Sequence, residues 1–141
     1  MTIEISADRA RMDVAVIHGF LSQDSYWAKN VPREVVERAV EHSLCVGAFE
    51  DGVQVGFARA ITDYATFAYI ADVFVLPSHR GHGISKQLMD ALVNHRELHG
   101  LRRWHLVTRD AHGLYAQFGF TPVDVPERHM MRVVTDAYSG R

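Results

Sequence analysis

Apolar residues recur along this chain at two different spacings, and the change from one to the other predicts the order of its elements. Ile3 and Ile5 alternate with polar neighbours, which is typical of a short strand over residues 2–6. The apolar residues between 14 and 21 then recur at helical spacing. A second helix is expected from Pro32, because proline suits a first helical turn and Glu34 is favourable near a helix N-terminus. The chain therefore begins with a strand and two helices.

Two strand-like runs follow, on either side of a turn that contains glycine. Residues 44–49 and 53–61 are joined by Glu-Asp-Gly at 50–52, which predicts an antiparallel hairpin, and another strand is expected over 66–76. Helical spacing resumes after Gly83, and Gly100 is expected to end that helix. The remaining expected elements are a strand over 101–108, a short helix over 111–118 and a last strand over 130–134.

This order predicts an α/β fold, a sandwich of the α+β type in which helices flank a mixed central sheet. The sheet is expected to be antiparallel early and parallel where a helix connects two strands. A chain of 141 residues buries roughly 70% of its unfolded surface, which is enough for one core. We therefore expect residues 1–141 to form a single domain.

Composition and charge narrow the classes of partner. The chain has 15 Lys and Arg against 17 Asp and Glu, a formal charge of -2, so we expect no nucleic-acid surface. The longest apolar run, residues 65–76, is interrupted by Asp72 and is far shorter than the roughly 20 residues of a membrane span. The N-terminus lacks the basic and apolar segments of a secretion signal, and Cys45 is the only cysteine. We expect a cytoplasmic protein with no membrane or nucleic-acid partner.

A basic loop with two glycines lies between the strand that stops near Pro77 and the next helix. A loop at a helix N-terminus binds phosphate because unpaired N–H groups and the positive end of the helix dipole converge there. Gly81 and Gly83 permit close approach of an anion. Positive or potentially positive side chains surround it: His79, Arg80, His82 and Lys86. The spacing does not match a P-loop or a dinucleotide-binding fingerprint, and the structural alternative is a glycine turn with solvated basic residues.

The residues of this loop resemble a known family. Val75-x-Pro77-x-x-Arg80-Gly81-x-Gly83-Ile84 is similar to the coenzyme A loop of the GNAT N-acetyltransferase superfamily, whose core pattern is Arg/Gln-x-x-Gly-x-Gly/Ala. Ser85 departs at the last position but is small enough to preserve close approach. A second segment, Leu106-x-Thr108-x-x-Ala111-x-x-Leu114-Tyr115-x-x-Phe118-Gly119-Phe120, resembles the strand-helix-strand segment of that superfamily. The resemblance covers about residues 65–120.

The resemblance implies a fold, a donor and a reaction. It implies that acetyl-CoA lies in a V-shaped opening where two parallel strands splay apart, and that a primary amine attacks the thioester directly in a ternary complex. Tyr115 is implied to lie near the coenzyme thiol and to protonate the departing thiolate, as a neutral phenol in a pocket can do. The residues implied to bind the coenzyme are Val73, Phe74, Val75, Arg80, Gly81, His82, Gly83, Ile84 and Ser85.

The acceptor side is less defined. Asp72 is the only charged residue between Ala65 and Leu76, and a carboxylate in so apolar a run is costly unless it is paired or functional. We interpret it as the candidate general base, with a salt bridge to Arg59 or Arg109 as an equally good alternative. Three further candidates for substrate binding have structural alternatives in core packing or turn formation: Tyr26, Trp27 and Asp63.

Other readings of the sequence remain. Two pairs of histidines, at 79 and 82 and at 95 and 99, lack a third ligand at useful spacing, so we expect no metal. The acceptor can be a small-molecule amine or a peptide or protein amine. Domains of this size commonly pair through sheet edges or C-terminal strands, so a homodimer is one of the assemblies that the sequence allows. The main rival function is a non-catalytic module that binds or senses acyl-CoA.

Overall fold

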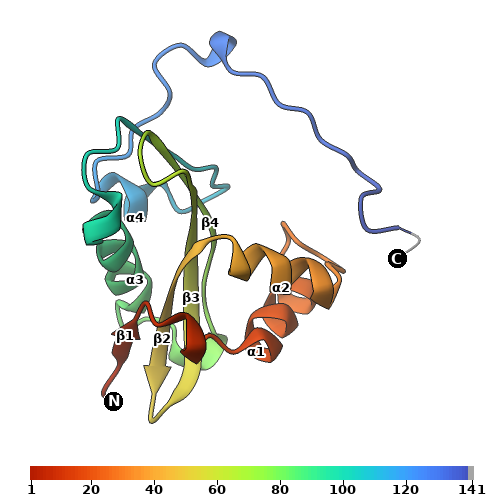
Figure 1. Cartoon of the computed structure of the whole chain (residues 1–141), viewed down its shortest axis with the longest axis vertical. Helices are drawn as coiled ribbons and strands as arrows, with labels where there is room; N and C mark the ends of the chain where they lie inside the picture. The colour runs from red at the N-terminus through yellow and green to blue at the C-terminus, as the bar shows by residue number, and fades with distance from the viewer. Residues whose placement is uncertain (140–141) are drawn as a thin grey trace.

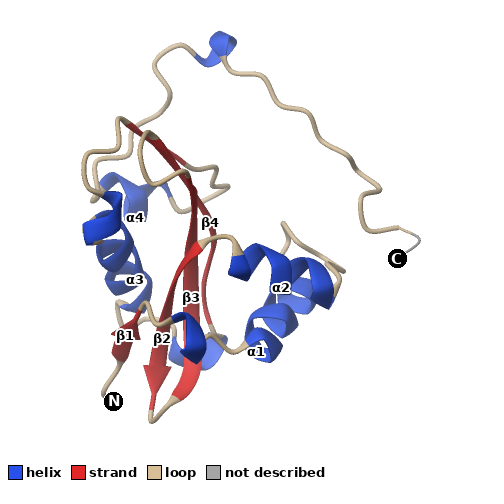
Figure 2. Ribbon diagram, viewed as in Figure 1, coloured by secondary structure: helices blue, strands red, loops and turns tan. Residues whose placement is uncertain are grey.

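A five-stranded mixed sheet runs through the middle of the molecule and has helices on both faces (Figures 1 and 2). This computed structural model describes residues 1–139. The strands lie in chain order: β1 (Glu4–Ser6), β2 (Leu44–Glu50), β3 (Val53–Thr62), β4 (Phe67–Val75) and β5 (Arg103–His105). The first three junctions are antiparallel and the β4–β5 junction is parallel, so the predicted mixed, splayed α/β fold is confirmed.

Two pairs of helices cover the sheet. On one face lie α1 (Val14–Gly19), which continues as a π-helical segment (Phe20–Asp24), and α2 (Arg33–Glu41). On the other face lie α3 (Ile84–Val93) and the short α4 (His112–Ala116) (Figure 2). Asp13 begins α1, where its side chain accepts a hydrogen bond from the Val16 N–H at 3.3 Å, as expected of an N-cap residue.

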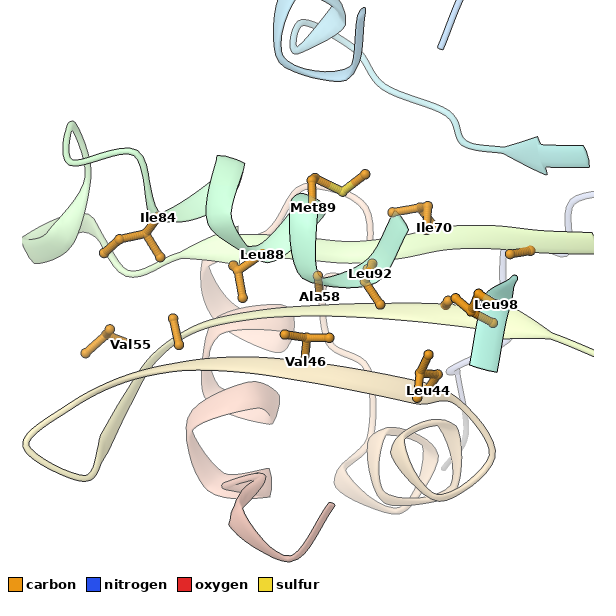
Figure 3. Close-up of a cluster of buried hydrophobic side chains, with 13 residues drawn as sticks. Leu44, Val46, Val55, Ala58, Ile70, Ile84, Leu88, Met89, Leu92 and Leu98 are labelled. Atoms are coloured by element: carbon orange, nitrogen blue, oxygen red, sulfur yellow. The ribbon is translucent and has the colours of Figure 1, made fainter. Parts of the chain in front are cut away.

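Both faces of the sheet are buried because successive side chains of a strand point to opposite sides. Ile84, Leu88, Met89 and Leu92 form the buried stripe of α3 and pack on β2–β4 (Figure 3). On the opposite face, α1 and α2 pack on Phe57 and Phe74, and Phe74 stacks on Phe20 at 4.2 Å between ring centroids. This double burial explains why β2 and β3 are almost continuously apolar.

Two expected boundaries are wrong. The α3 helix ends at Val93 and not near Gly100, because Nδ1 of His95 accepts the Glu97 N–H at 3.1 Å and begins a 3-10 turn over Arg96–Leu98. β5 has three residues and not the eight of 101–108, because the chain diverges from β4 after His105.

The expected strand over residues 130–134 is also absent. Among the described residues this segment pairs with no strand, and a strand requires a neighbour to which its backbone can hydrogen-bond. The segment is instead extended and exposed to solvent.

No helix within residues 1–139 is both long enough and apolar enough to cross a membrane.

Candidate active site

The sheet opens between β4 and β5. Three register pairs join these strands, ending at Tyr69 with His105, whereas β4 continues to Val75 and stays paired with β3. The β3–β4 register also shifts, since Phe57 faces Phe74 but Arg59 faces Ala71. Two residues of β4, at 72 and 73, therefore oppose one residue of β3, which is a β-bulge. The bulge bends β4 at the point where β5 leaves it.

A cavity of about 410 Å³ occupies this opening, and we call it the splay cavity. One wall is formed by β4 and the other by the chain between β5 and α4. Its lining residues are Tyr26, Trp27, Tyr69, Ile70, Ala71, Asp72, Val73, Leu106, Val107, Thr108, Asp110, Ala111 and Tyr115. The structure thus brings together five of the residues that the sequence selected, from three separate segments: Tyr26, Trp27, Asp72, Val73 and Tyr115.

Asp72 occupies the bulge, with the positive φ of +55° that is uncommon outside glycine. Its Oδ2 accepts a hydrogen bond from Arg59 Nε at 2.6 Å, and its Oδ1 accepts one from Trp27 Nε1 at 2.7 Å. The carboxylate and guanidinium side chains are only 12% and 15% exposed. Arg59 is further held by Ser43, whose Oγ lies 3.0 Å from Arg59 Nη1. The ion pair with Arg59, one of the two alternatives considered for this residue, is therefore present.

Asp72 and Trp27 also separate the splay cavity from a second space, of about 220 Å³, which we call the helix-side pocket. The helix-side pocket lies between the sheet and the α1–α2 pair. Its walls are apolar side chains of those helices and Phe57, with Arg59 and Asp72 as its charged groups. Tyr138, near the end of the described chain, lines it as well. The two spaces share the Asp72–Trp27 partition.

Tyr26 and Trp27 form an exposed aromatic wall at the mouth of the splay cavity. They are 53% and 43% exposed, and their rings meet edge-to-face at 5.0 Å. The Arg109 guanidinium lies 3.9 Å from the centre of the Tyr26 ring, a cation–π contact that links the two walls. Arg109 pairs with Asp110 at 3.6 Å and not with Asp72, so the other proposed salt bridge of Asp72 does not form.

Tyr115 lies on α4 and faces the splay cavity. Just before α4, the Ala111 N–H donates a hydrogen bond to Thr108 Oγ1 at 3.0 Å. Burial raises the pKa of the Tyr115 phenol, and interaction with Tyr26 raises it further. The phenol therefore stays protonated at neutral pH, which is the state that a proton donor needs.

The glycine loop lies at the far end of β4. A 3-10 turn over Pro77–His79 leads into Arg80, and both Gly81 and Gly83 adopt positive φ, +81° and +75°. Apart from the adjoining residues of the chain, no heavy atom lies within 4 Å of the position that a Cβ would take at either glycine. Gly83 precedes α3 without any side-chain hydrogen bond to the first turn. This geometry is an open cradle of backbone next to the positive end of a ten-residue helix.

Two basic side chains of the loop are already engaged. Arg80 Nε donates to the Val75 carbonyl at 3.1 Å, which draws the side chain over the end of β4. His79 Nε2 lies 2.9 Å from Glu50 Oε1, and its Nδ1 lies 2.7 Å from Ser78 Oγ. Both ring nitrogens of His79 therefore already have partners, one of them at the end of β2. His82 on the loop and Lys86 in the first turn of α3 are both exposed.

The predicted coenzyme residues of β4 have different environments. Val73 lines the splay cavity, whereas the Phe74 side chain is 4% exposed and packs in the core under α1. Phe74 can therefore contact a ligand only through its backbone. Ile84 is likewise 2% exposed and serves the core, although its N–H belongs to the first turn of α3.

Asp63 lies in the β3–β4 turn and not in the lining of the splay cavity. Its Oδ1 accepts the N–H groups of Ala65, Thr66 and Phe67 at 2.9, 2.8 and 3.2 Å, and its Oδ2 accepts the Thr66 hydroxyl at 2.6 Å. These hydrogen bonds, led by that of the Thr66 hydroxyl, hold the pKa of the Asp63 carboxyl well below its usual range. The turn-forming alternative accounts for Asp63.

Sequence reasoning missed several wall residues. Tyr69 stands where β4 and β5 separate, and its position became visible only with the strand register. Tyr138, which lines the helix-side pocket, lies in the C-terminal part of the chain, where the sequence showed no motif. Within residues 1–139, no three His, Cys, Asp or Glu side chains gather as they would around a metal ion.

Comparisons with known proteins agree with this geometry. The model of the acetyltransferase (GNAT) family matches residues 7–120. A Gibberella zeae protein provisionally named an acetyltransferase is 32% identical over 135 residues, which cover 80% of this chain and 75% of that protein.

Solved structures share the fold. A crystal structure from Xanthomonas campestris pv. campestris, provisionally assigned to the same family as an acetyltransferase, is 56% identical. It superposes with a TM-score of 0.94 over 99% of this chain and 98% of that one. A Clostridium acetobutylicum structure, assigned as an acetyltransferase and solved with acetyl-CoA, is 17% identical with a TM-score of 0.67. That match covers 94% of this chain and 96% of the other, and at such low identity it shows the fold alone.

Proposed function

Because the chain belongs to the acetyltransferase (GNAT) family, we propose that it transfers an acetyl group from acetyl-CoA to a primary amine within a ternary complex. One observation carries this proposal. The splay cavity containing Tyr115 and the two-glycine cradle lie along the same strand, β4, on the side that β5 leaves open. A long ligand with an anionic end and a reactive end fits such an arrangement.

The cradle supports binding of the pyrophosphate end of the donor. Gly81 and Gly83 adopt positive φ and leave open space where any other residue would place a Cβ. The first-turn N–H groups of α3, from Ile84 and Ser85 onward, receive no side-chain cap from Gly83. Backbone N–H groups and the helix dipole together favour a phosphate at this position, and Arg80 adds a fixed positive charge beside it.

The strand supports binding of the middle of the donor. Beyond Tyr69, β4 keeps its pairing with β3 but has left β5, so its second edge faces the splay cavity. Backbone groups at the free edge of a strand are available to the amides of an extended ligand, as in strand addition. Val73 and Val75 are the β4 residues expected to make these contacts, with Phe74 contributing its backbone only.

The donor supplies an activated acyl group, and the side chains around it determine whether transfer is efficient. The neutral amine nitrogen forms a bond to the thioester carbonyl carbon, and the C–S bond breaks to release a thiolate. Tyr115 gives its phenolic proton to that thiolate, and the proton lost by the amine returns through solvent. The raised pKa of Tyr115 keeps the phenol protonated for this step.

The acceptor enters past the aromatic wall in this proposal. Tyr26 and Trp27 are exposed at the mouth of the splay cavity, and aromatic faces attract the ammonium form of an amine. The carboxylate of Asp72 stands behind Trp27 and retains the second lone pair of each oxygen. Its role as general base stays a prediction, since both oxygens already accept hydrogen bonds from Trp27 and Arg59.

Release of coenzyme A thiol tests the reaction. Acetyl-CoA is incubated with the protein and a panel of metabolite amines, amino acids and peptides, and we expect thiol release that depends on one class of amine. Tyr115→Phe is expected to lower kcat by about 100-fold with little change in acetyl-CoA affinity, the size of a lost general acid. Tyr64→Phe is the matched control, because Tyr64 lies in the β3–β4 turn outside the splay cavity.

Two outcomes oppose the proposal. Tight acetyl-CoA binding with no acceptor-dependent thiol release across the panel supports the rival acyl-CoA-sensing module. Competition by ATP or NAD for the donor site supports a nucleotide-binding domain instead. An unchanged kcat in Tyr115→Phe would rule out its role as proton donor. The transferase proposal would then depend only on the thiol release measured with the panel of amines.

A further inference from the structure

The helix-side pocket takes no part in the proposed binding of the donor. It lies on the face of the sheet covered by α1 and α2, whereas the cradle is at the start of α3 on the other face (Figure 2). Much of its lining is hydrocarbon, and five of the lining side chains are 6% exposed or less: Ile17, Leu21, Val36, Val40 and Phe57. The pocket is therefore an apolar space that directly adjoins the proposed reaction site.

The volume of the helix-side pocket suits one small hydrocarbon group. An apolar protein cavity of about 150 Å³ holds a benzene ring, and this pocket measures about 220 Å³. A phenyl ring or a branched chain of about five carbons is of the right size. A hydroxyl group fits poorly, because it would give up its hydrogen bonds to water among hydrocarbon side chains.

The two charged groups of the lining already pair with each other. Arg59 Nε donates to Asp72 Oδ2 at 2.6 Å, and Arg59 Nη1 donates to Ser43 Oγ at 3.0 Å. Among the described residues, the other polar groups of the lining side chains are the Tyr138 phenol and the Trp27 indole N–H. A carboxylate entering this pocket would have to compete with Asp72 for the guanidinium, so the lining favours a ligand whose buried part is uncharged.

Asp72 and Trp27 connect this pocket to the splay cavity. Both side chains line both spaces, and Trp27 Nε1 donates to Asp72 Oδ1 at 2.7 Å. Trp27 is 43% exposed and lies in the stretch of residues 25–32, which contains no helix or strand. A charge-assisted hydrogen bond from an ammonium group to a carboxylate is stronger than one from a neutral indole N–H. An amine can therefore compete with Trp27 for Asp72 Oδ1.

We propose that the acceptor is an amine with an apolar substituent, which occupies the helix-side pocket while the nitrogen lies at the Asp72–Trp27 partition. The ammonium group replaces the Trp27 N–H as the hydrogen-bond partner of Asp72 Oδ1. After its proton passes to solvent, the nitrogen faces the splay cavity, where Tyr115 and the thioester of the proposed donor lie. This assignment rests on the proposed acetyl transfer, and it favours hydrocarbon amines over amino sugars, amino acids and protein amines.

Thiol release with a series of amines tests the pocket. Straight-chain amines from methylamine to pentylamine are compared at saturating acetyl-CoA, and kcat/KM is expected to rise about 4-fold with each added methylene. Ethanolamine has a hydroxyl where propylamine has its last methyl group, so its kcat/KM should be lower by about 10-fold or more. Isopentylamine should exceed leucine, which has the same branched chain and a carboxylate in addition. A flat series, or a preference for ethanolamine or leucine, overturns the assignment.

Ala39→Leu fills the pocket from α2. Ala39 lines the helix-side pocket, and leucine is also a good helix former. The ratio of kcat/KM for pentylamine to kcat/KM for methylamine should therefore fall by about 10-fold or more. This ratio is measured within one protein, so a partial loss of folded protein does not change it.

Ala15→Leu is the matched control, because Ala15 is exposed on α1 and lines neither the helix-side pocket nor the splay cavity. It should keep the ratio of the unaltered protein. Ala28→Leu is a second filling variant, which changes the pocket outside α2. An unchanged ratio in both filling variants contradicts occupation of the pocket.

Trp27→Phe tests the exchange of hydrogen-bond partners at the partition. The variant keeps an aromatic ring but removes the N–H that the amine has to displace, so the KM for pentylamine is expected to fall about 5-fold. A merely structural role of the indole predicts the opposite direction, because loss of its contact with Asp72 would disturb both spaces. An unchanged or raised KM contradicts the exchange.

Calorimetry separates failure of the pocket from failure of the transferase. Pentylamine is titrated into the protein with and without coenzyme A, and we expect binding with a negative heat-capacity change, because apolar surface is buried. Binding that Ala39→Leu abolishes, with no thiol release from acetyl-CoA, supports the pocket and refutes the transferase. Thiol release without any preference for longer amines supports the transferase and refutes the pocket.

Discussion

Replacing Asp72 by asparagine tests whether this residue anchors the cavity wall or takes the acceptor proton. The change removes the negative charge 2.6 Å from Arg59 Nε, in side chains that are 12% and 15% exposed. Unit charges about 4 Å apart attract by about 4 kcal/mol at an effective dielectric constant near 20, and breaking a buried pair costs about 3–5 kcal/mol. The residual exposure and the retained acceptor for Trp27 reduce the expected loss to about 2–3 kcal/mol.

A double-mutant cycle measures this loss. Asp72→Asn, Arg59→Met and the double variant are unfolded in urea and, separately, by heat. Asp72→Asn is expected to lower the free energy of unfolding by about 2–3 kcal/mol and Tm by roughly 6–10 °C for a chain of this size. The coupling energy between the two sites should exceed about 1 kcal/mol. Asp110→Asn is the matched control, because its pair with Arg109 is 3.6 Å long and 71% and 63% exposed, so its loss should stay below about 1 kcal/mol. A coupling energy indistinguishable from zero would refute the anchoring role.

The pH profile of the same variant addresses the base. An anchor predicts that kcat/KM of Asp72→Asn rises with pH as in the unaltered protein, because the acceptor amine still loses its proton to water. A general base predicts that the rise governed by Asp72 disappears while the folded protein persists. Loss of the pH-dependent rise in a variant of unchanged stability would therefore assign the proton transfer to Asp72 and reject the anchor.

Three further changes test other parts of the structure. Gly83→Ala is expected to destabilise the protein by about 1 kcal/mol, because alanine is strained at positive φ, and to raise the KM for acetyl-CoA. Gly19→Ala, at a helical position with open space around it, should do neither. Equal effects of the two substitutions would contradict the proposed role of the glycine loop in binding the donor. Burial raises the pKa of the Cys45 thiol to about 11, so a thiol reagent at pH 8 should react slowly until urea unfolds the chain, and rapid labelling of the native protein would be inconsistent with that burial. Because the raised pKa keeps Tyr115 protonated, kcat should fall at alkaline pH only above the ordinary phenol pKa near 10. If ionisation of Tyr115 lowered kcat at a pH below that value, burial would not be raising the pKa of its phenol.

Local chemistry accounts for what the sequence by itself determined. Hydrophobic spacing placed β2, β3, β4 and α3, because period two and period 3.6 are properties of short segments. Gly81 and Gly83 were selected because glycine permits close approach of an anion, and the structure adds that both adopt the positive φ that favours glycine. Tyr115 was selected from a motif, and in the structure it lines the splay cavity; its role as proton donor stays a prediction.

The tertiary structure alone decided which distant residues meet. Asp72 had two arginines as candidate partners in the sequence, and the β3–β4 register with its bulge brought Arg59 to it, while Trp27 arrived from 45 positions away. The end of β5 at His105 and the unpaired state of residues 130–134 were likewise invisible, since a strand exists only where a neighbour supplies its hydrogen bonds. Periodicity reports which face of a segment is buried; strand register and the path of the chain determine what lies against that face, and these depend on contacts between residues far apart in the sequence.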